Sequence, residues 1–414
     1  MKFLDKIKEF WNNQTRNYKV FLTRDILSTL FGNLVGRYSS IYMTTLGATT
    51  EEIGYLTSIL SAVRLLLSIP GGILTDRAKN IKKLYLSGRL LQLPINLVKA
   101  FYPQYFIYSV TRVWDVVTFR VTMPTSNIIS IASMSNKDRV KSLVMNRTII
   151  SVVGLVAPFL AAWMVITFGG LEDKNSFMPL FLVQFVISIV IFIMMWKGLE
   201  EPQYVRRAVK EKNPLKDAVG IFKEYPGLKR MLLLNVVRTL FINMRMPYIQ
   251  LYFYNFKNAD AYIIAAQGTI STAVTLLLSI PMGAIADKYG RKRMGYASQI
   301  LMAACVLAAV LTPPEYPQLI LLYSLLSSIG SCMDIGWQAF VQEYIPLDAR
   351  GRWSGLSTTA TALIGIPAPI IGAWLWNYNP DLLWWISLVY YLLLAIPLRY
   401  SIPDKNKKQI TSET

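Results

Sequence analysis

The sequence predicts an all-α polytopic membrane protein: twelve transmembrane helices in two pseudo-symmetric bundles of six, with both chain termini in the cytoplasm. Three observations lead to this prediction, namely apolar runs of about 20 residues, an internal repeat, and a one-sided distribution of basic residues along the 414-residue chain. Hydrophobic residues make up 53% of the chain and charged residues only 16%, whereas about 25% of the residues of a soluble domain are charged.

Twelve apolar segments are long enough to cross the hydrocarbon core of a bilayer. They cover residues 19–45, 53–75, 83–101, 105–131, 143–168, 177–196, 230–254, 261–286, 294–312, 317–342, 353–376 and 381–399. The charged stretch 197–229 lies between the sixth and seventh segments and predicts a cytoplasmic linker. The predicted domains are therefore a six-helix bundle over 1–196, this linker, and a second bundle with a short cytoplasmic tail over 230–414.

An internal repeat relates the two halves. Residues 65–77 read LLLSIPGGILTDR and residues 276–288 read LLLSIPMGAIADK, with Pro70 matched to Pro281. Two further matches keep this register to within one residue: Thr29 to Asn33 with Thr239 to Asn243, and Gly154, Pro158 and Trp163 with Gly365, Pro369 and Trp374. Because both halves begin on the same side and hold six segments, we predict parallel repeats about an axis along the membrane normal. The shared Gly and Pro residues predict either a helix kink or close helix packing in both halves.

Basic residues collect in the loops on one side of the predicted bundle. The N-terminal tail, the linker, the shorter loops on the same side and the C-terminal tail, with which Arg399 is counted, hold most of them, whereas Lys99, Lys174 and Lys257 fall on the other side. This asymmetry predicts a multi-pass protein of the cell membrane with both termini cytoplasmic. It also accounts for the net charge of +19, so that no nucleic-acid partner is expected. Residues 3–11 predict a short helix at the membrane surface, with a basic tail as the alternative.

The residue types that catalysis and metal binding commonly need are scarce. The chain has no histidine, and its two cysteines, Cys305 and Cys332, lie inside apolar segments. Imidazole metal sites and proton relays are therefore excluded, and no nucleotide-binding loop is present. We expect neither an enzyme nor a bound metal or cofactor, and we assign no catalytic residue.

The loops after the second and eighth segments carry a common motif, Gly-x-x-x-Asp-Arg/Lys-x-Gly-Arg-Arg/Lys. The second copy matches it at Gly283, Asp287, Lys288, Gly290, Arg291 and Lys292; the first matches at Gly72, Asp76 and Arg77 but has Lys79 and Asn80 in place of Gly and Arg. With twelve segments and parallel halves, the chain resembles a transporter of the major facilitator superfamily over essentially its whole length. The resemblance implies two bundles around a central cavity that opens alternately to each side, with a cytoplasmic gate at these loops. A basic turn that only fixes topology is the alternative.

Arginines inside the apolar segments have few acids to pair with. They are Arg24, Arg37, Arg64, Arg89, Arg112, Arg120, Arg147, Arg238 and Arg245. Because arginine stays charged and is costly within lipid, the deeper ones are expected to face a cavity or a partner. Arg24, Arg89 and Arg147 lie near the inner ends of their segments, and we expect them to extend to the interface.

Asp25, Asp115 and Asp334 are the candidates for proton coupling, because the chain has no histidine. Arg112 resembles the arginine of the family's helix-4 pattern, which is associated with coupling in proton-linked members, although Trp114 and Asp115 stand where Gln and Gly are usual. The proton affinity of a carboxylate depends on whether a nearby cation pairs with it. A static Arg112–Asp115 ion pair is the alternative.

The substrate cavity is expected on the first and fourth helices of each half, which line it in the resembled family. The candidates are Asn33 and Arg37 in the first segment, Phe119 in the fourth, Arg238, Asn243 and Tyr248 in the seventh, and Trp337 and Gln338 in the tenth. In the first segment, a stripe of polar and small residues from Asp25 to Ser40 shares one helix face, and lipid would give such a face no partner. For the aromatic candidates, packing is the alternative.

The predicted function is secondary active transport of small organic solutes, coupled to protons and directed out of the cell, as in the proton-linked drug and metabolite antiporters of the resembled family. The expected partners are the lipid bilayer, a small-molecule substrate and protons, and the chain is expected to act as a monomer. Two alternatives remain open. One is an exchanger of organic anions or phosphate esters, which the buried arginines suit. The other is a lipid-handling or sensing protein that does not pump, for which Arg64 is the indication.

Overall fold

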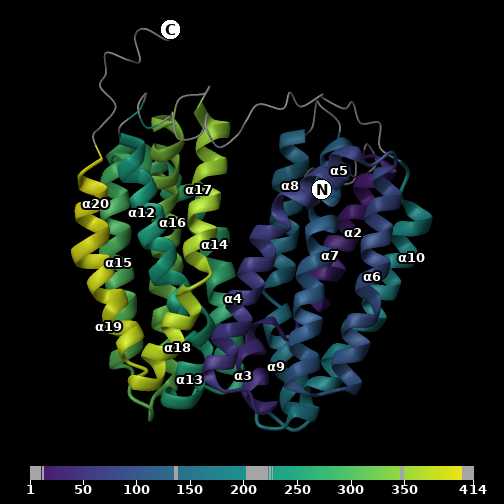
Figure 1. The fold of residues 1–414 in the computed structure, drawn as a ribbon, viewed down its shortest axis with the longest axis horizontal. Coiled ribbons are helices and arrows are strands. Elements are labelled where there is room, and N and C mark those ends of the chain that lie inside the picture. Colours follow the sequence, from purple (N-terminus) through teal and green to yellow (C-terminus); the bar gives the residue numbers. More distant parts are fainter. Residues whose placement is uncertain are drawn as a thin grey trace, which may run out of the picture. The chain divides into compact units, whose positions relative to one another are not determined.

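A computed structural model describes residues 14–134, 139–201, 227–345 and 349–402, together with Trp11, Phe222 and Tyr225. The described part of the chain is helical and contains no strand (Figure 1). All of the expected surface helix over residues 3–11 except Trp11, most of the predicted linker and the C-terminal tail beyond Ile402 lie outside the described residues. Contacts group the chain into two compact units.

The first unit is drawn from Met1–Ala48, Ala62–Ala208 and Ile264–Thr269, and the second from Thr49–Ser61, Val209–Ile263 and Ile270–Thr414. Two short segments, Thr49–Ser61 and Ile264–Thr269, thus group with the opposite half of the sequence. The predicted domain boundaries at 196 and 230 stay a prediction.

The helices up to the predicted linker follow one another with short connections. They are α2 (Arg16–Phe31), η1 (Gly36–Tyr38), α3 (Ser39–Thr45), α4 (Thr50–Leu66), α5 (Ser68–Arg77), α6 (Ile81–Phe101), α7 (Tyr105–Ala132), α8 (Arg139–Gly154), α9 (Ala157–Thr167), η2 (Lys174–Phe177) and α10 (Met178–Gly198).

The helices after the linker repeat this order. They are α12 (Gly227–Arg245), η3 (Met246–Tyr248), α13 (Ile249–Lys257), α14 (Ala261–Tyr289), α15 (Arg291–Leu311), η4 (Pro317–Leu319), α16 (Ile320–Tyr344), α17 (Arg350–Gly365), α18 (Ala368–Tyr378), α19 (Leu382–Val389), the π-helical turn η6 (Tyr390–Ala395) and α20 (Ile396–Tyr400).

Seven helical stretches among the described residues are long and apolar enough to cross a membrane. They are Arg139–Thr167, Lys174–Gly198, Ala261–Tyr289, Arg291–Leu311, Pro317–Tyr344, Arg350–Tyr378 and Leu382–Tyr400. An eighth is added if α4 and Pro70–Arg77 of α5, which meet at 42°, form one bent span. The helices α6 and α7 are long enough to cross a membrane but are not apolar enough, because they carry several charged and amide side chains. The count of twelve therefore stays a prediction.

Matching breaks interrupt corresponding segments of the two halves, which confirms the predicted kinks. The fifth segment is broken between α8 and α9, at Leu155 and Val156, and the eleventh between α17 and α18, at Ile366 and Pro367. Proline near the start of α9 and of α18 lacks the amide donor and crowds the preceding turn, so that it ends the helix before it. The first and seventh segments are also interrupted, at η1 and η3, and only η3 has a proline at its start.

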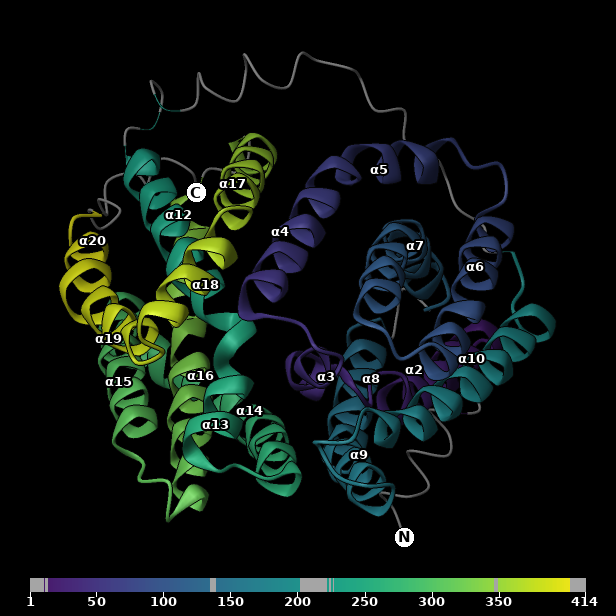
Figure 2. The ribbon, with the colours of Figure 1, turned by 60° about the horizontal axis from the view of Figure 1, so that its bottom comes forward.

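Apolar side chains hold the helices of each unit together. In the first unit, Phe21, Tyr85, Ile129 and Met195 form one buried cluster that joins α2, α6, α7 and α10. Helix α6 packs against α7 and α10, and α10 packs against α2 (Figure 2). In the second unit, a corresponding cluster joins α12, α16 and α17. The cluster of the first unit packs together one end of α2, α6, α7 and α10, the four helices that carry the polar site described below.

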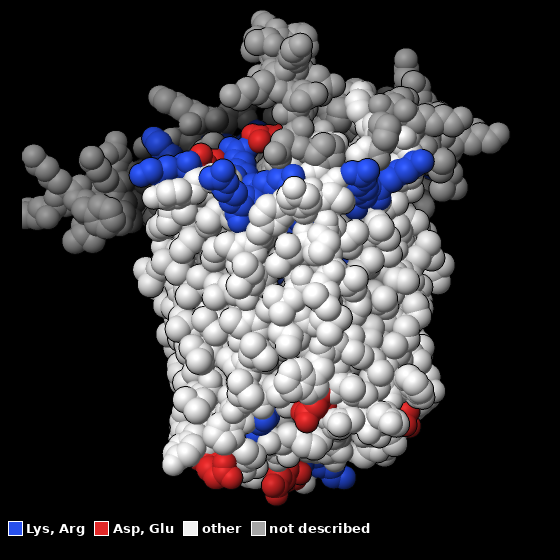
Figure 3. Space-filling model, turned by 90° about the vertical axis from the view of Figure 1, so that its left-hand side faces the viewer, with Lys and Arg blue, Asp and Glu red and all other residues white. Residues whose placement is uncertain are grey.

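One face of the second unit shows how its charges are distributed. On the side on which α15, α19 and α20 lie, most Lys and Arg residues gather at the end where α20 ends, and acidic residues lie at both ends (Figure 3). Between them lies a broad belt of uncharged residues. Such a belt is what the hydrocarbon core of a bilayer requires.

Candidate functional site

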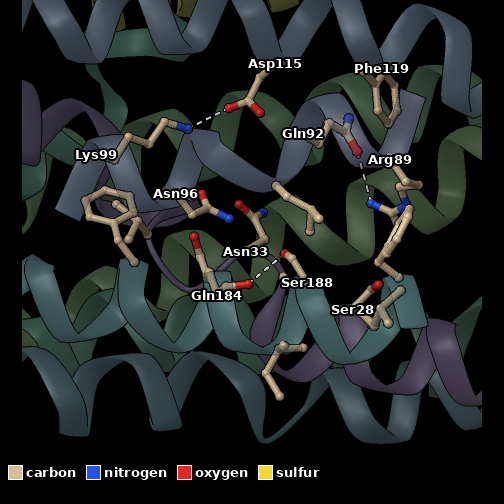
Figure 4. A pocket seen from close by; sticks show the side chains of 18 of the residues that line it. Ser28, Asn33, Arg89, Gln92, Asn96, Lys99, Asp115, Phe119, Gln184 and Ser188 are labelled. Carbon is tan, nitrogen blue, oxygen red and sulfur yellow. Dashed lines mark hydrogen bonds and ion pairs between the residues drawn. The ribbon is translucent and has the colours of Figure 1, made fainter. Parts of the chain in front are cut away.

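The first unit encloses a polar cavity of about 420 Å³ between α2, α6, α7 and α10 (Figure 4). Its wall contains six ionisable side chains that lie within the helices: Arg24, Asp25, Arg89, Lys99, Arg112 and Asp115. The polar stripe of the first segment lines this cavity through Asp25, Ser28, Gly32, Asn33 and Gly36. The predicted Phe119 is also part of the wall.

Lys99 and Asp115 form an ion pair inside the cavity. The distance between Lys99 Nζ and Asp115 Oδ2 is 2.6 Å, and the two side chains are 6% and 35% exposed. The assignment of Lys99 to an outer loop is therefore wrong: it lies in the last turn of α6, and its ammonium group is buried because a carboxylate on α7 compensates it. The alternative Arg112–Asp115 ion pair is not formed.

Arg112 lines the same cavity without a fixed partner. Within the described part of the chain, its guanidinium makes no hydrogen bond and no ion pair. Arg64 lies within electrostatic range of Arg112 and also of a further arginine, Arg120. The positive charge at this point of the unit is therefore in excess.

Arg24 and Arg89 are turned inward, so that the expectation that they extend to the membrane interface is wrong. Arg24 pairs with Asp25 and donates hydrogen bonds to Ser126 Oγ, at 2.9 Å, and to Tyr85 Oη, at 3.2 Å. Arg89 donates to the same Tyr85 oxygen and to Gln92 Oε1, both at 3.1 Å. The hydroxyl of Tyr85, a fully buried residue, thus holds two guanidinium groups at one end of the cavity.

Amide side chains occupy the middle of the cavity. Asn33 comes from the turn after α2, Asn96 from α6 and Gln184 from α10. The three side chains point towards one another, between the Lys99–Asp115 pair and the Arg89–Gln92 pair (Figure 4). Gln184 is only 6% exposed, and its side-chain amide has no partner among the residues that the structure describes. These groups are free to bind a polar ligand.

Sequence reasoning missed the contribution of the third and sixth segments. Four polar residues of α6 share one helix face at spacings of three and four: Arg89, Gln92, Asn96 and Lys99. This spacing is the same signal that identified the stripe of the first segment. The predicted cavity included only the first and fourth helices of each half, and α6 is the third helix.

The second unit holds a separate network around Asp334. Its Oδ1 atom lies 2.7 Å from Arg399 Nη2, and its Oδ2 atom lies 3.3 Å from a guanidinium nitrogen of Arg238. Arg399 is only 1% exposed, donates to the Gly295 carbonyl oxygen at 2.6 Å, and lies over the ring of Trp337. The assignment of Arg399 to the cytoplasmic tail is therefore wrong, because Asp334 compensates its charge in the core.

The other predicted cavity residues lie in different environments. Tyr248 and Trp337 are buried in the core of the second unit, so that packing is the interpretation that holds for them; Tyr248 donates to the Pro369 carbonyl oxygen at 2.7 Å. Gln338 is exposed although its neighbour Trp337 is buried. Asn243 lies against Gly365, where a Cβ atom would be 3.0 Å from its Nδ2 atom.

Arg37, in the first unit, lies across Gly268, where a Cβ atom would be 2.4 Å from its Nε atom. A larger residue at this position would displace the guanidinium from its present place.

The two copies of the loop motif use different contacts. In the second, Gly290 takes a positive φ of 102° between α14 and α15, and Asp287 Oδ1 accepts a hydrogen bond from Arg291 Nε at 2.9 Å. Arg291 also pairs with Glu343 of α16, and Lys288 lies over the ring of Tyr289. In this second copy of the motif, Arg291 is therefore held by acidic residues of the second unit.

In the first copy, Asn80 stands where the pattern has Arg and caps α6 by accepting a hydrogen bond from the Lys83 amide at 2.7 Å. The side chains of Asp76 and Arg77 make no ion pair or hydrogen bond with any described residue. At Gly72 and Gly283 an added Cβ atom would meet nothing within 4 Å. The role of both loops as a gate stays a prediction.

Comparisons with known proteins identify the class of protein. The family model of the Major Facilitator Superfamily matches residues 21–266 and 231–414, and the chain belongs to this family. An uncharacterized MFS-type transporter of Methanocaldococcus jannaschii is 22% identical over 408 residues, which cover 95% of this chain and 96% of that protein.

Solved structures share the fold. The crystal structure of the nucleoside transporter NupG has a TM-score of 0.77 at 15% identity and covers 94% of this chain and 100% of its own. The inward-facing, occupied structure of a bacterial homolog to the human lysosomal transporter Spinster has a TM-score of 0.69 at 11% identity and covers 92% and 95%. At these identities the similarity concerns the fold alone.

Proposed function

We propose that this chain is a secondary active transporter that moves a small organic solute by alternating access of two six-helix bundles, 1–196 and 230–414, joined by the linker 197–229. Family membership and the whole-length similarity to transporter folds support transport. The Lys and Arg residues that gather at the end where α20 ends (Figure 3) belong to the side of the bundle on which the sequence places most basic loops. This supports cytoplasmic termini in a cell membrane. We further propose twelve membrane-spanning helices and a monomer.

The Lys99–Asp115 pair is the observation that carries the proposed coupling to protons. A proton carrier must reach water and must change partners during the cycle. The Asp115 side chain is 35% exposed in the cavity, whereas those of Asp25 and Asp334 are 18% and 5% exposed. Arg112, three residues before Asp115 on the same helix and without a partner, offers a second cation in place of Lys99. Protonation of Asp115 releases Lys99, which then joins the unpaired Arg112 as a cation that can bind the solute.

The other two acids have partners that suit a structural role. Asp25 pairs with Arg24 and also accepts a hydrogen bond from Asn146 Nδ2 at 3.4 Å, and Asp334 is enclosed between two guanidinium groups. We therefore place the coupling at Asp115. Export is the direction that we propose, on the resemblance to proton-linked antiporters alone.

Flux into proteoliposomes tests this function. Radiolabelled uridine, glycerol 3-phosphate, succinate and a lipophilic cation are each offered with and without an imposed gradient of one pH unit. Such a gradient supplies about 1.4 kcal/mol per proton, and we expect one of these solutes to accumulate up to about tenfold. A protonophore should abolish the accumulation. Flux that ignores both the gradient and the protonophore would contradict proton coupling.

Exchange of organic anions is the second candidate function, and the unpartnered Arg112 favours it. Exchange needs no proton carrier. In the same vesicles it would give anion uptake that depends on an anion inside and that is insensitive to the pH gradient.

A further inference from the structure

We propose that the cavity of the first unit, whose wall includes Arg89 and Arg112, binds a compact oxyanion, a carboxylate or phosphate group of the solute. This inference rests on the proposed transport function and adds to it the chemical class of the substrate. It also assigns recognition to a space within one unit, on helices α2, α6, α7 and α10.

The charge balance of the cavity is the first argument. Its wall carries four basic side chains and two acidic ones. Each acid already has a cation of its own, since Asp25 pairs with Arg24 and Asp115 pairs with Lys99. Arg89 and Arg112 are left without a carboxylate. Two permanent cations within the apolar part of a bundle are costly, and an anionic ligand offsets that cost.

The free hydrogen-bond donors are the second argument. Arg89 uses Nε and Nη1 for Tyr85 and Gln92 and keeps Nη2, whereas Arg112 keeps its whole guanidinium. A guanidinium fork binds both oxygens of a carboxylate or phosphate at once. The amides of Asn96 and Gln184 point into the same space (Figure 4). Gln184 is buried and its side-chain amide has no partner among the described residues, and an unmade hydrogen bond of a buried amide is costly, which favours a ligand there.

The size of the cavity sets a limit on the ligand. About 420 Å³ lies near the lower end of the range of small-molecule sites. The space suits a phosphorylated or carboxylated metabolite of a few carbon atoms.

Equilibrium binding to the full-length protein in nanodiscs tests the proposal. Radiolabelled orthophosphate and succinate are the two anionic probes, and uridine is the neutral one, all at one ionic strength. We expect saturable binding of at least one anion, and the preferred probe distinguishes phosphate from carboxylate. Arg112→Gln should weaken that binding about tenfold or more, because a hydrogen bond to a charged group is lost in a buried site.

Arg120→Gln is the matched control. It removes the same charge from the same helix but lies outside the cavity wall, and binding should stay within about twofold. Arg112→Lys should retain part of the affinity, and Gln184→Leu should weaken binding by a few fold. If Arg112→Gln does not fold, weaker anion binding by Arg112→Lys and Gln184→Leu tests whether this cavity is the binding site.

Two results would overturn the proposal: neither anion binds saturably, or Arg112→Gln and Arg120→Gln weaken binding equally. Uridine flux in proteoliposomes without anion binding would remove the anionic class and leave the transport function standing. Absence of flux for every solute, with anion binding intact, would remove the transport function instead.

Discussion

Asp334→Ala is expected to lower the free energy of unfolding by about 3–5 kcal/mol, because it leaves a buried guanidinium without its carboxylate. Arg399 is 1% exposed and Asp334 3% exposed, so that water cannot replace the lost partner. Thermal and denaturant unfolding of the purified protein, followed by circular dichroism, measures the change.

Two variants give this result its controls. Asp287→Asn breaks an ion pair at a site where the aspartate is 62% exposed, and it should change the stability by less than about 1 kcal/mol. Asp334→Ala combined with Arg399→Met removes both buried charges and should recover most of the loss. If Asp334→Ala unfolds as wild type does, the network around Asp334 does not stabilise the second unit.

Lys99→Asp is expected to reduce transport by at least about tenfold, which corresponds to about 1.4 kcal/mol in the barrier. It removes the cation that now pairs with Asp115 at 2.6 Å and places a carboxylate on the facing helix, so that an attractive charge pair becomes a repulsive one. Initial rates of solute uptake in proteoliposomes measure the effect.

The exchanged pair, Lys99→Asp with Asp115→Lys, restores opposite charges between α6 and α7. It should recover a large part of the uptake rate if the ion pair itself is what matters. A double variant no more active than Lys99→Asp alone would show that the chemistry at each position matters separately, and that the pair is not the working unit.

The fold was largely predictable from the sequence, because lipid and repetition leave strong signals. Apolar runs identify membrane spans, and residues that recur in register identify the two halves. The breaks near Pro158 and Pro369 could be predicted because the same kink pattern occurs in both copies. The number of membrane spans stays a prediction. Length and apolar character identify a span, and the helices that carry the polar site are less apolar than the others.

The site was predictable only in part. The stripe on the first segment indicated the cavity correctly, but Lys99 and Arg399 were placed in a loop and a tail because each lies near the end of an apolar run. A charged residue in that position either reaches the interface or turns inward. Which of the two occurs depends on a carboxylate from another helix, here Asp115 or Asp334. A single sequence does not reveal such a partner across helices.

The change in pH inside proteoliposomes on addition of the transported solute tests the central claim most directly. A trapped pH-sensitive dye records proton movement, and radiolabelled solute records exchange in the same vesicles. With wild type we expect solute to move protons; with Asp115→Asn we expect solute exchange without proton movement, because the carrier has lost its titratable group. Proton movement that persists in Asp115→Asn, at the wild-type ratio to solute, would contradict the assignment of coupling to the Lys99–Asp115 pair.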